Sequence, residues 1–384
     1  MKVSNSNVAA PSHADVKDGP NAERASCGRA EGSPLAASAG AFSHPFWMIC
    51  RELPKAYWNY EDFEIEFNND LEAYDAHQKI GQGKYSEVFR GWNRTTGRPC
   101  VLKILKPVRY RKIQREISIL QNLCGGPNVV RLLDVLQDAR TNTIVLVTEY
   151  VENPVTLRWL MNKSLLENFD LRYYMYEILR TLDFAHRRGI FHRDIKPHNI
   201  MIDHKHRILR VIDWGLAEYY LHNEALNCGV ATRHYKGPEL LLGYRHYDFS
   251  LDIWCLGCVF AGIIFHADPF FDGYSNEDQL LRIVAVFGTD AVRRYVAKYN
   301  AQIPRAVVSN LEGMAPGHCG WKRFVKSSGS KHCDDLALNL LDKMLQFDHQ
   351  DRIMAHDAMT HPYFEPVRRA LESNPNQRYP FVPV

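Results

Sequence analysis

Short stretches of alternating apolar and polar residues dominate positions 74–150. The segments 87–92, 99–105 and 144–149 follow this period of two and are separated by turn residues, which predicts half-buried strands. One stretch between them has helical spacing and ends at the Gly-Gly-Pro of 125–127, with apolar side chains at Ile113, Ile117, Leu120 and Leu123. These patterns predict a small β-rich lobe with one main helix.

From about residue 155 onward the apolar spacing becomes helical. One long amphipathic helix is predicted from Leu171, Met175, Ile178, Leu182 and Ala185. Another is predicted near the end of the chain from Leu336, Leu340, Leu341, Met344 and Leu345. The almost wholly apolar stretch 251–265 predicts a buried helix. We therefore expect an α+β fold, with a small antiparallel β lobe over 74–150 and a larger, mostly helical lobe over 151–365.

The two ends of the chain differ from this body. Residues 1–43 are rich in Ala, Ser, Gly, Pro and Asn and have too few large apolar side chains to offset ordering entropy, so we expect a disordered extension. Residues 44–73 are rich in aromatic side chains, which predicts an ordered arm docked on the body: Phe46, Trp47, Tyr57, Trp58, Tyr60, Phe63 and Phe67. Residues 366–384 are expected to form a tail, loose over 374–384, where three prolines occur.

Composition adds few constraints. A net charge of +3 over 384 residues does not by itself indicate a nucleic-acid ligand. Nine scattered cysteines favour a reducing compartment, and Cys255 and Cys258 lie in an apolar stretch typical of helix packing rather than of zinc binding. The longest apolar run, 253–265, is shorter than the roughly 18–20 residues that a membrane-spanning helix needs, and there is no secretory signal. We expect no membrane association and a location in the nucleus, the cytoplasm or both.

The most informative motif is His192-Arg193-Asp194-Ile195-Lys196-Pro197-His198-Asn199, followed by Ile212-Asp213-Trp214-Gly215. Moving a phosphoryl group from a nucleotide to a hydroxyl needs these residue types. Asp194 can accept the hydroxyl proton, and Lys196 can stabilise charge on the transferred group. Asn199 and Asp213 can hold magnesium ions. A solvated polar turn is the simpler interpretation, but an eight-residue match to H-R-D-[LI]-K-P-x-N argues against it.

The nucleotide side of the predicted site lies in the β-rich lobe. The run Gly81-Gln82-Gly83-Lys84-Tyr85-Ser86-Glu87-Val88 is a glycine-rich loop that lets backbone approach phosphates, although such hairpins are common and Ser86 replaces the usual third glycine. Lys103 on a strand and Glu116 on the predicted helix are expected to pair, because an inward-facing lysine is costly without a partner. Glu239 and Arg352 are predicted to form a buried structural ion pair.

Taken together, these motifs resemble those of eukaryotic protein kinases, and in detail those of the catalytic alpha subunit family of casein kinase II, over about residues 55–365. Trp214 in place of the Phe of D-F-G, the glycine loop 81–89 and the segments 103–108, 198–204, 236–241 and 347–352 carry this likeness. The resemblance implies the bilobal protein kinase fold and a constitutively active Ser/Thr kinase that uses ATP, and also GTP, with Mg²⁺. It further implies a casein kinase II regulatory (beta) subunit dimer as a partner.

The resemblance also assigns site residues. The nucleotide site is expected to comprise the glycine-loop residues together with Ile80, Val101, Lys103, Glu149, Val151, Met201 and Ile212. Acidic protein substrates are expected to contact four cations: Arg233, Lys236, Arg111 and Lys112. The chain departs from the family at Gly229, where an arginine is expected, at Tyr110 and Gln114, which thin the basic cluster, and at Thr148, where the family usually has Phe.

Two other functions remain open at this point. A pseudokinase scaffold would be indicated by the loss of a catalytic residue, but Lys103, Asp194, Asn199 and Asp213 are all present. A protein whose main ligand is a polyanion is suggested by the cations between Lys103 and Arg115, since binding there would release counterions. The catalytic motifs make polyanion binding a side activity.

Overall fold

The structure is a computed structural model that describes residues 46–326 and 331–373, and all of these belong to one compact unit spanning 37–384. The predicted disordered extension 1–43 and the predicted loose tail 374–384 lie outside the described residues.

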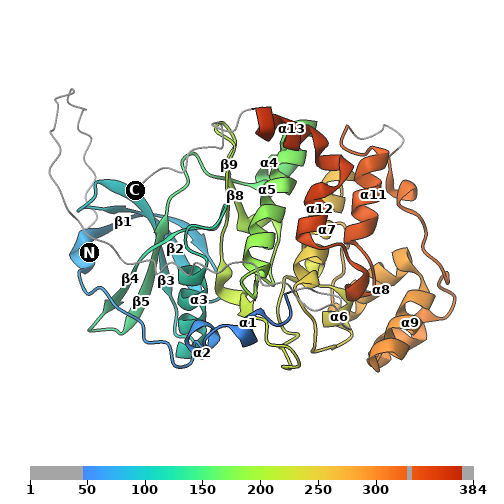
Figure 1. Cartoon of the computed structure of the whole chain (residues 1–384), viewed down its shortest axis with the longest axis horizontal. Helices are drawn as coiled ribbons and strands as arrows, with labels where there is room; N and C mark the ends of the chain where they lie inside the picture. Colours follow the sequence, from blue (N-terminus) through green and yellow to red (C-terminus); the bar gives the residue numbers. More distant parts are fainter. Residues whose placement is uncertain (1–45, 327–330, 374–384) are drawn as a thin grey trace. The chain divides into compact units, whose positions relative to one another are not determined.

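A five-stranded antiparallel sheet forms the N-terminal lobe (Figure 1). Its order is β1-β2-β3-β5-β4, with β1 Tyr74–Gln82, β2 Ser86–Asn93, β3 Arg98–Leu105, β4 Leu132–Asp138 and β5 Thr143–Glu149. The three segments with clear alternation are β2, β3 and β5 at the centre. The pattern did not single out β1 and β4 because they are edge strands, and β1 exposes most of its side chains.

One helix, α3 (Tyr110–Asn122), covers one face of this sheet (Figure 1). Its predicted apolar residues Ile113 and Ile117 pack on Val135, Ile144 and Leu146. The helix begins three residues before the first apolar position of the pattern and ends one residue before the last. α3 therefore joins the lobe that holds the glycine loop, and it carries Glu116.

The C-terminal lobe is mostly helical, as predicted. The apolar face of α5 (Asn168–His186) is fully buried, and every residue of α7 (Ser250–Ile264) is buried. The remaining helices are α4 Leu157–Asn162, α6 Pro238–Leu241, α8 Asn276–Phe287, α9 Thr289–Tyr299, α10 Arg305–Leu311, α11 Asp335–Met344, α12 Ala355–Thr360 and α13 Glu365–Ser373. Within the described ranges, no helix combines the length and apolar character needed to cross a membrane.

Short strands hold the two loops that carry the catalytic motifs. The loop 192–199 runs from β7 (Ile190–Phe191) to β8 (Ile200–Asp203), and the segment 212–217 runs from β9 (Ile208–Val211) to β10 (Glu218–Tyr219). β10 pairs with β7, while β8 lies between β9 and β6 (Val155–Thr156). These pairings bring the two motifs side by side.

The aromatic arm before β1 contacts both lobes. It contains α1 (Ile49–Glu52) and α2 (Lys55–Trp58). The Tyr57 hydroxyl donates to the carbonyl of Arg188, and Asn122 of α3 donates to the carbonyl of Tyr57. Gln114 is buried and donates to the carbonyl of Phe63 at 2.8 Å. Gln114, one of the residues at which the chain departs from the resembled family, therefore anchors the arm to α3.

Candidate active site

A buried carboxylate organises the loop that carries Asp194. Asp252 accepts hydrogen bonds from the backbone N–H groups of His192 and Arg193, both at 2.8 Å, and contacts the His186 ring at 3.0 Å. Burial alone would raise the pKa of Asp252, but the hydrogen bond and charge of His186 lower it below its ordinary value. Arg193 has a positive φ of 64°, a strained conformation that these bonds hold in place.

Asp194 is held from two sides and is 4% exposed. Its Oδ2 accepts from the Lys196 ammonium at 2.6 Å and from the Asn199 amide at 3.2 Å. Its Oδ1 accepts from both the backbone N–H and the hydroxyl of Thr232, each at 2.8 Å. Lys196 also donates to the Thr232 hydroxyl at 2.9 Å. The carboxylate orientation is therefore fixed by the catalytic loop and by the segment that follows the second motif.

Lys103 joins the two lobes through a pair of carboxylates. Its ammonium lies 2.7 Å from Glu116 and 2.9 Å from Asp213, so the predicted Lys103–Glu116 pair is confirmed. Burial would lower the pKa of Lys103, but the two carboxylates raise it above its ordinary value. Attraction to Lys103 lowers the pKa of Asp213. Both groups are therefore charged at neutral pH.

The second motif is anchored by its tryptophan. Trp214 is fully buried, donates to the carbonyl of Val211 at 3.1 Å and packs edge-on against His192. Asp213 has a positive φ of 60°, which directs its carboxylate to Lys103. A Cβ on Gly215 would lie 3.1 Å from a Glu116 oxygen, so the glycine allows α3 to approach closely.

Asn199 and Asp213 are suited to a magnesium ion by their chemistry. Asn199 uses its amide nitrogen to donate to the Asp194 carbonyl at 2.9 Å, which leaves the amide oxygen as an acceptor. The Asp213 side chain is 49% exposed. Mg²⁺ prefers oxygen ligands and is usually held by one or two protein groups plus phosphate oxygens and water. Among residues 46–326 and 331–373 no cluster of three or more His, Cys, Asp or Glu could hold a metal by itself.

The residues expected to bind the nucleotide lie on the sheet and on the β8–β9 hairpin. The glycine loop is the β1–β2 turn, where Gly83 bonds to the Ser86 carbonyl and Lys106 donates to the Gly83 carbonyl at 3.1 Å. Val88 pairs with Lys103 across the ladder, and Val101 pairs with Thr148.

The end of β5 is joined to the β8–β9 hairpin. Glu149 forms an ion pair with Arg210 at 2.8 Å, and Arg210 lies opposite Met201. Val151, which follows Glu149 by two residues, is buried. The backbone N–H of Ile212 donates to the Asn199 carbonyl. Cavities of about 420 and 320 Å³ lie in the helical lobe and include none of these residues.

The four cations expected to bind substrate do not all present free charge. Arg233 and Lys112 are exposed. Arg111 is also exposed, but its guanidinium pairs with Glu61 at 2.6 Å. Lys236 is buried, and its ammonium donates to the carbonyls of Cys228 and Val230, so its charge is directed into the chain here, and its expected contact with substrate stays a prediction. Burial lowers the pKa of Lys236, and its amine anchors the 228–230 loop.

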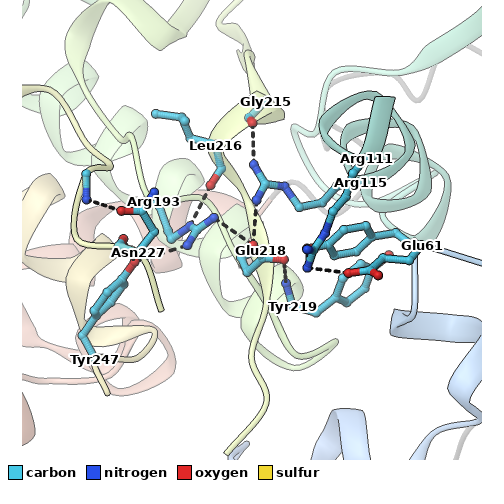
Figure 2. Close-up of polar contacts among 12 residues, drawn as sticks. Glu61, Arg111, Arg115, Arg193, Gly215, Leu216, Glu218, Tyr219, Asn227 and Tyr247 are labelled. Carbon is cyan, nitrogen blue, oxygen red and sulfur yellow. Dashed lines mark hydrogen bonds and ion pairs between the residues drawn. The ribbon is translucent and has the colours of Figure 1, made fainter. Parts of the chain in front are cut away.

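Sequence reasoning missed the role of Glu218 (Figure 2). One oxygen of its carboxylate accepts from Arg115 of α3 at 2.6 Å and from Arg193 of the catalytic loop at 3.1 Å. Arg115 also donates to the Gly215 carbonyl, and Arg193 to the Leu216 carbonyl. The partners lie up to 103 residues apart, so no local spacing could have signalled them. The Glu218 carboxylate thus links α3 to the catalytic loop.

The fold and the site define a phosphotransferase. An antiparallel sheet carries a glycine loop and a paired lysine, and a helical lobe carries two acids on adjacent loops. The model of one family, the protein kinase domain, matches residues 74–364. The chain belongs to this family, whose members transfer phosphate with ATP and a divalent metal. The predicted fold class, a small antiparallel lobe and a larger helical lobe, is confirmed.

Proposed function

We propose that this kinase phosphorylates Ser and Thr in acidic contexts and is of the casein kinase II catalytic type. The observation that carries the proposal is the assembled site: Lys103 bonds to Glu116 and Asp213, and Asp194 is fixed by Lys196 and Thr232. A pseudokinase would not require this arrangement. The subfamily rests on the resemblance of the catalytic motifs and glycine loop, described above.

Each residue has a defined task in the proposed reaction. Asp194 orients the acceptor hydroxyl and takes its proton, while Lys196 stabilises charge near the acceptor. Lys103, held by Glu116, positions the nucleotide phosphates. When bound at Asn199 and Asp213, magnesium neutralises phosphate charge. Because the transition state of phosphoryl transfer is loose, Asp194 contributes mainly by positioning the hydroxyl.

Acidic preference is proposed to depend on Arg233 and Lys112. Arg233 is exposed and directly follows Thr232, which contacts Asp194, so an acid near the acceptor residue can reach it. Lys112 lies on the first turn of α3, where an acid further along the peptide can bind. Each charge-assisted contact contributes about 1.5–3 kcal/mol when the bound peptide partly removes it from water. With Lys236 turned inward and Gly229 uncharged, two contacts give a preference of about a hundredfold or more.

Other features of the resembled family are proposed on the same basis. GTP is proposed as a second phosphate donor, a regulatory (beta) subunit dimer as a partner, polyanions as ligands of the basic cluster, and the nucleus or cytoplasm as the location. These proposals rest on the resemblance and on the cations of 103–115.

The test is transfer of a labelled γ-phosphate to matched peptides. Each peptide has a single acceptor, which is serine, threonine or tyrosine, and this acceptor is followed by Asp, Ala or Lys residues. The Asp194→Asn variant serves as the catalytic control. We expect rapid transfer to the acidic Ser and Thr peptides alone. Equal rates for acidic and basic peptides would refute the specificity, and preference for tyrosine would refute the acceptor class. No transfer by the wild-type chain to any peptide would favour the scaffold function.

A further inference from the structure

One face of α3 carries a stripe of polar residues that faces the second catalytic motif. Arg115, Ser118 and Asn122 are spaced i, i+3 and i+7, so they lie along one side of the helix. Arg115 bonds to Gly215 and Glu218, as described above. Ser118 and Asn122 both bond to the hydroxyl of Tyr219, each at 2.7 Å. The whole stripe therefore contacts residues 215–219.

The Tyr219 hydroxyl has a full set of partners in a buried place. Tyr219 is 2% exposed and Ser118 is 5% exposed. Because the Asn122 amide nitrogen is only a donor, the Tyr219 oxygen accepts from it, and the Tyr219 proton is available to Ser118. The same amide also donates to the Tyr57 carbonyl at 2.9 Å. Burial raises the pKa of Tyr219, so the hydroxyl keeps its proton.

Contacts other than the hydroxyl fix the position of the Tyr219 ring. The ring stacks on Tyr60, with centroids 6.1 Å apart, and meets Tyr57 edge-on at 5.8 Å. Its backbone pairs with Ile190 in the β7–β10 ladder, immediately before the catalytic loop. The arm and the C-terminal lobe thus hold the Tyr219 ring in place. The Tyr219 hydroxyl then links α3 to both of them.

We propose that the Tyr219 hydroxyl is a positioning group for phosphoryl transfer, which fixes the rotation of α3 about its axis and so delivers Glu116 to Lys103. Glu116 directly follows Arg115 and lies two residues before Ser118. A rotation of α3 that moved Glu116 away from Lys103 would therefore strip Ser118 and Asn122 of a buried partner, which is costly. This inference rests on the proposed kinase function.

The first test compares Tyr219→Phe with Tyr220→Phe. Phenylalanine keeps the ring contacts of Tyr219 and removes only the hydroxyl. The Tyr220 hydroxyl contacts His222 at 3.5 Å rather than α3, so that variant is the matched control. We expect Tyr219→Phe to lower kcat/KM for ATP about tenfold while the KM for peptide stays unchanged, and Tyr220→Phe to leave both unchanged. A general loss of folded protein would instead lower kcat and kcat/KM by the same factor and leave the KM for ATP unchanged.

The second test asks whether Tyr219 acts through Glu116. In a Glu116→Gln background the Tyr219→Phe change should lower kcat/KM for ATP less than twofold, because the group that it positions is already impaired. Full additivity overturns the inference. Ser118→Ala, which removes one partner of the hydroxyl, supplies the same comparison if Tyr219→Phe folds poorly.

The two failures are distinguishable. An inactive wild-type chain refutes the proposed function. An active wild type in which Tyr219→Phe behaves like Tyr220→Phe overturns this inference alone.

Discussion

Replacing Glu218 by glutamine should separate α3 from the catalytic loop. The side chains of Glu218, Arg115 and Arg193 are 13%, 12% and 2% exposed, so water screens their charges little. Glutamine keeps the shape and one acceptor but removes the charge that both guanidinium groups share (Figure 2). The two arginines are then left buried without a counter-charge.

The magnitude follows from the two bonds. A hydrogen bond to a charged group contributes about 1.5–3 kcal/mol, against about 0.5–1.5 kcal/mol for a neutral one. Losing the carboxylate charge that both guanidinium groups contact therefore costs about 2–3 kcal/mol of unfolding free energy. Part of this lost free energy had stabilised the packing of α3 against the catalytic loop. The value of kcat/KM for ATP should therefore fall about tenfold or more.

Urea unfolding followed by tryptophan fluorescence, together with steady-state kinetics, measures both effects. Glu61→Gln is the matched control, because Glu61 pairs with Arg111 at the surface, where the two side chains are 51% and 63% exposed. Such a pair contributes less than about 1 kcal/mol. If Glu218→Gln and Glu61→Gln are indistinguishable in stability and in kinetics, the proposed role of Glu218 is wrong.

The remaining predictions concern the site and the arm. Asp194→Asn should lower kcat by several orders of magnitude with ATP affinity nearly unchanged, and Lys103→Met should abolish transfer; near-normal turnover of either variant contradicts the assignment. Deleting residues 1–43 should leave activity intact, whereas deleting 1–66 should destroy it by removing the contacts of Tyr57 with Arg188 and α3, so full activity of the longer deletion refutes a structural role for the arm. Chelation of divalent cations should stop transfer without changing the melting temperature, and a large drop in melting temperature would reveal a structural metal.

Local patterns predicted much of the fold for identifiable reasons. β2, β3, β5 and α3 bury one face each, so their apolar residues repeat with the period of their element. The edge strand β1 lacks this signal because most of its side chains are exposed. Lys103 and Glu116 could be paired from the sequence because a buried lysine needs a counter-charge and the order of the motifs indicated which acid supplies it.

Contacts that depend on distant residues could not be predicted in this way. Glu218 lies next to Arg115 and Arg193 only because β10 pairs with β7 and α3 packs above them. The inward direction of Lys236 depends on the backbone path of 228–230, which brings two carbonyls to its ammonium. A lysine beside a catalytic loop resembles a substrate contact in sequence, and only the fold shows where its charge lies.

The central proposal, that this chain is a kinase of the casein kinase II catalytic type, implies that it is active without phosphate on the chain. The most direct measurement is transfer of γ-phosphate to an acidic serine peptide by phosphatase-treated protein whose intact mass shows no phosphate. We predict full activity in the wild type and a loss of several orders of magnitude in Asp194→Asn. Activity that appears only after the chain itself is phosphorylated, or equal rates for the two proteins, would contradict the claim.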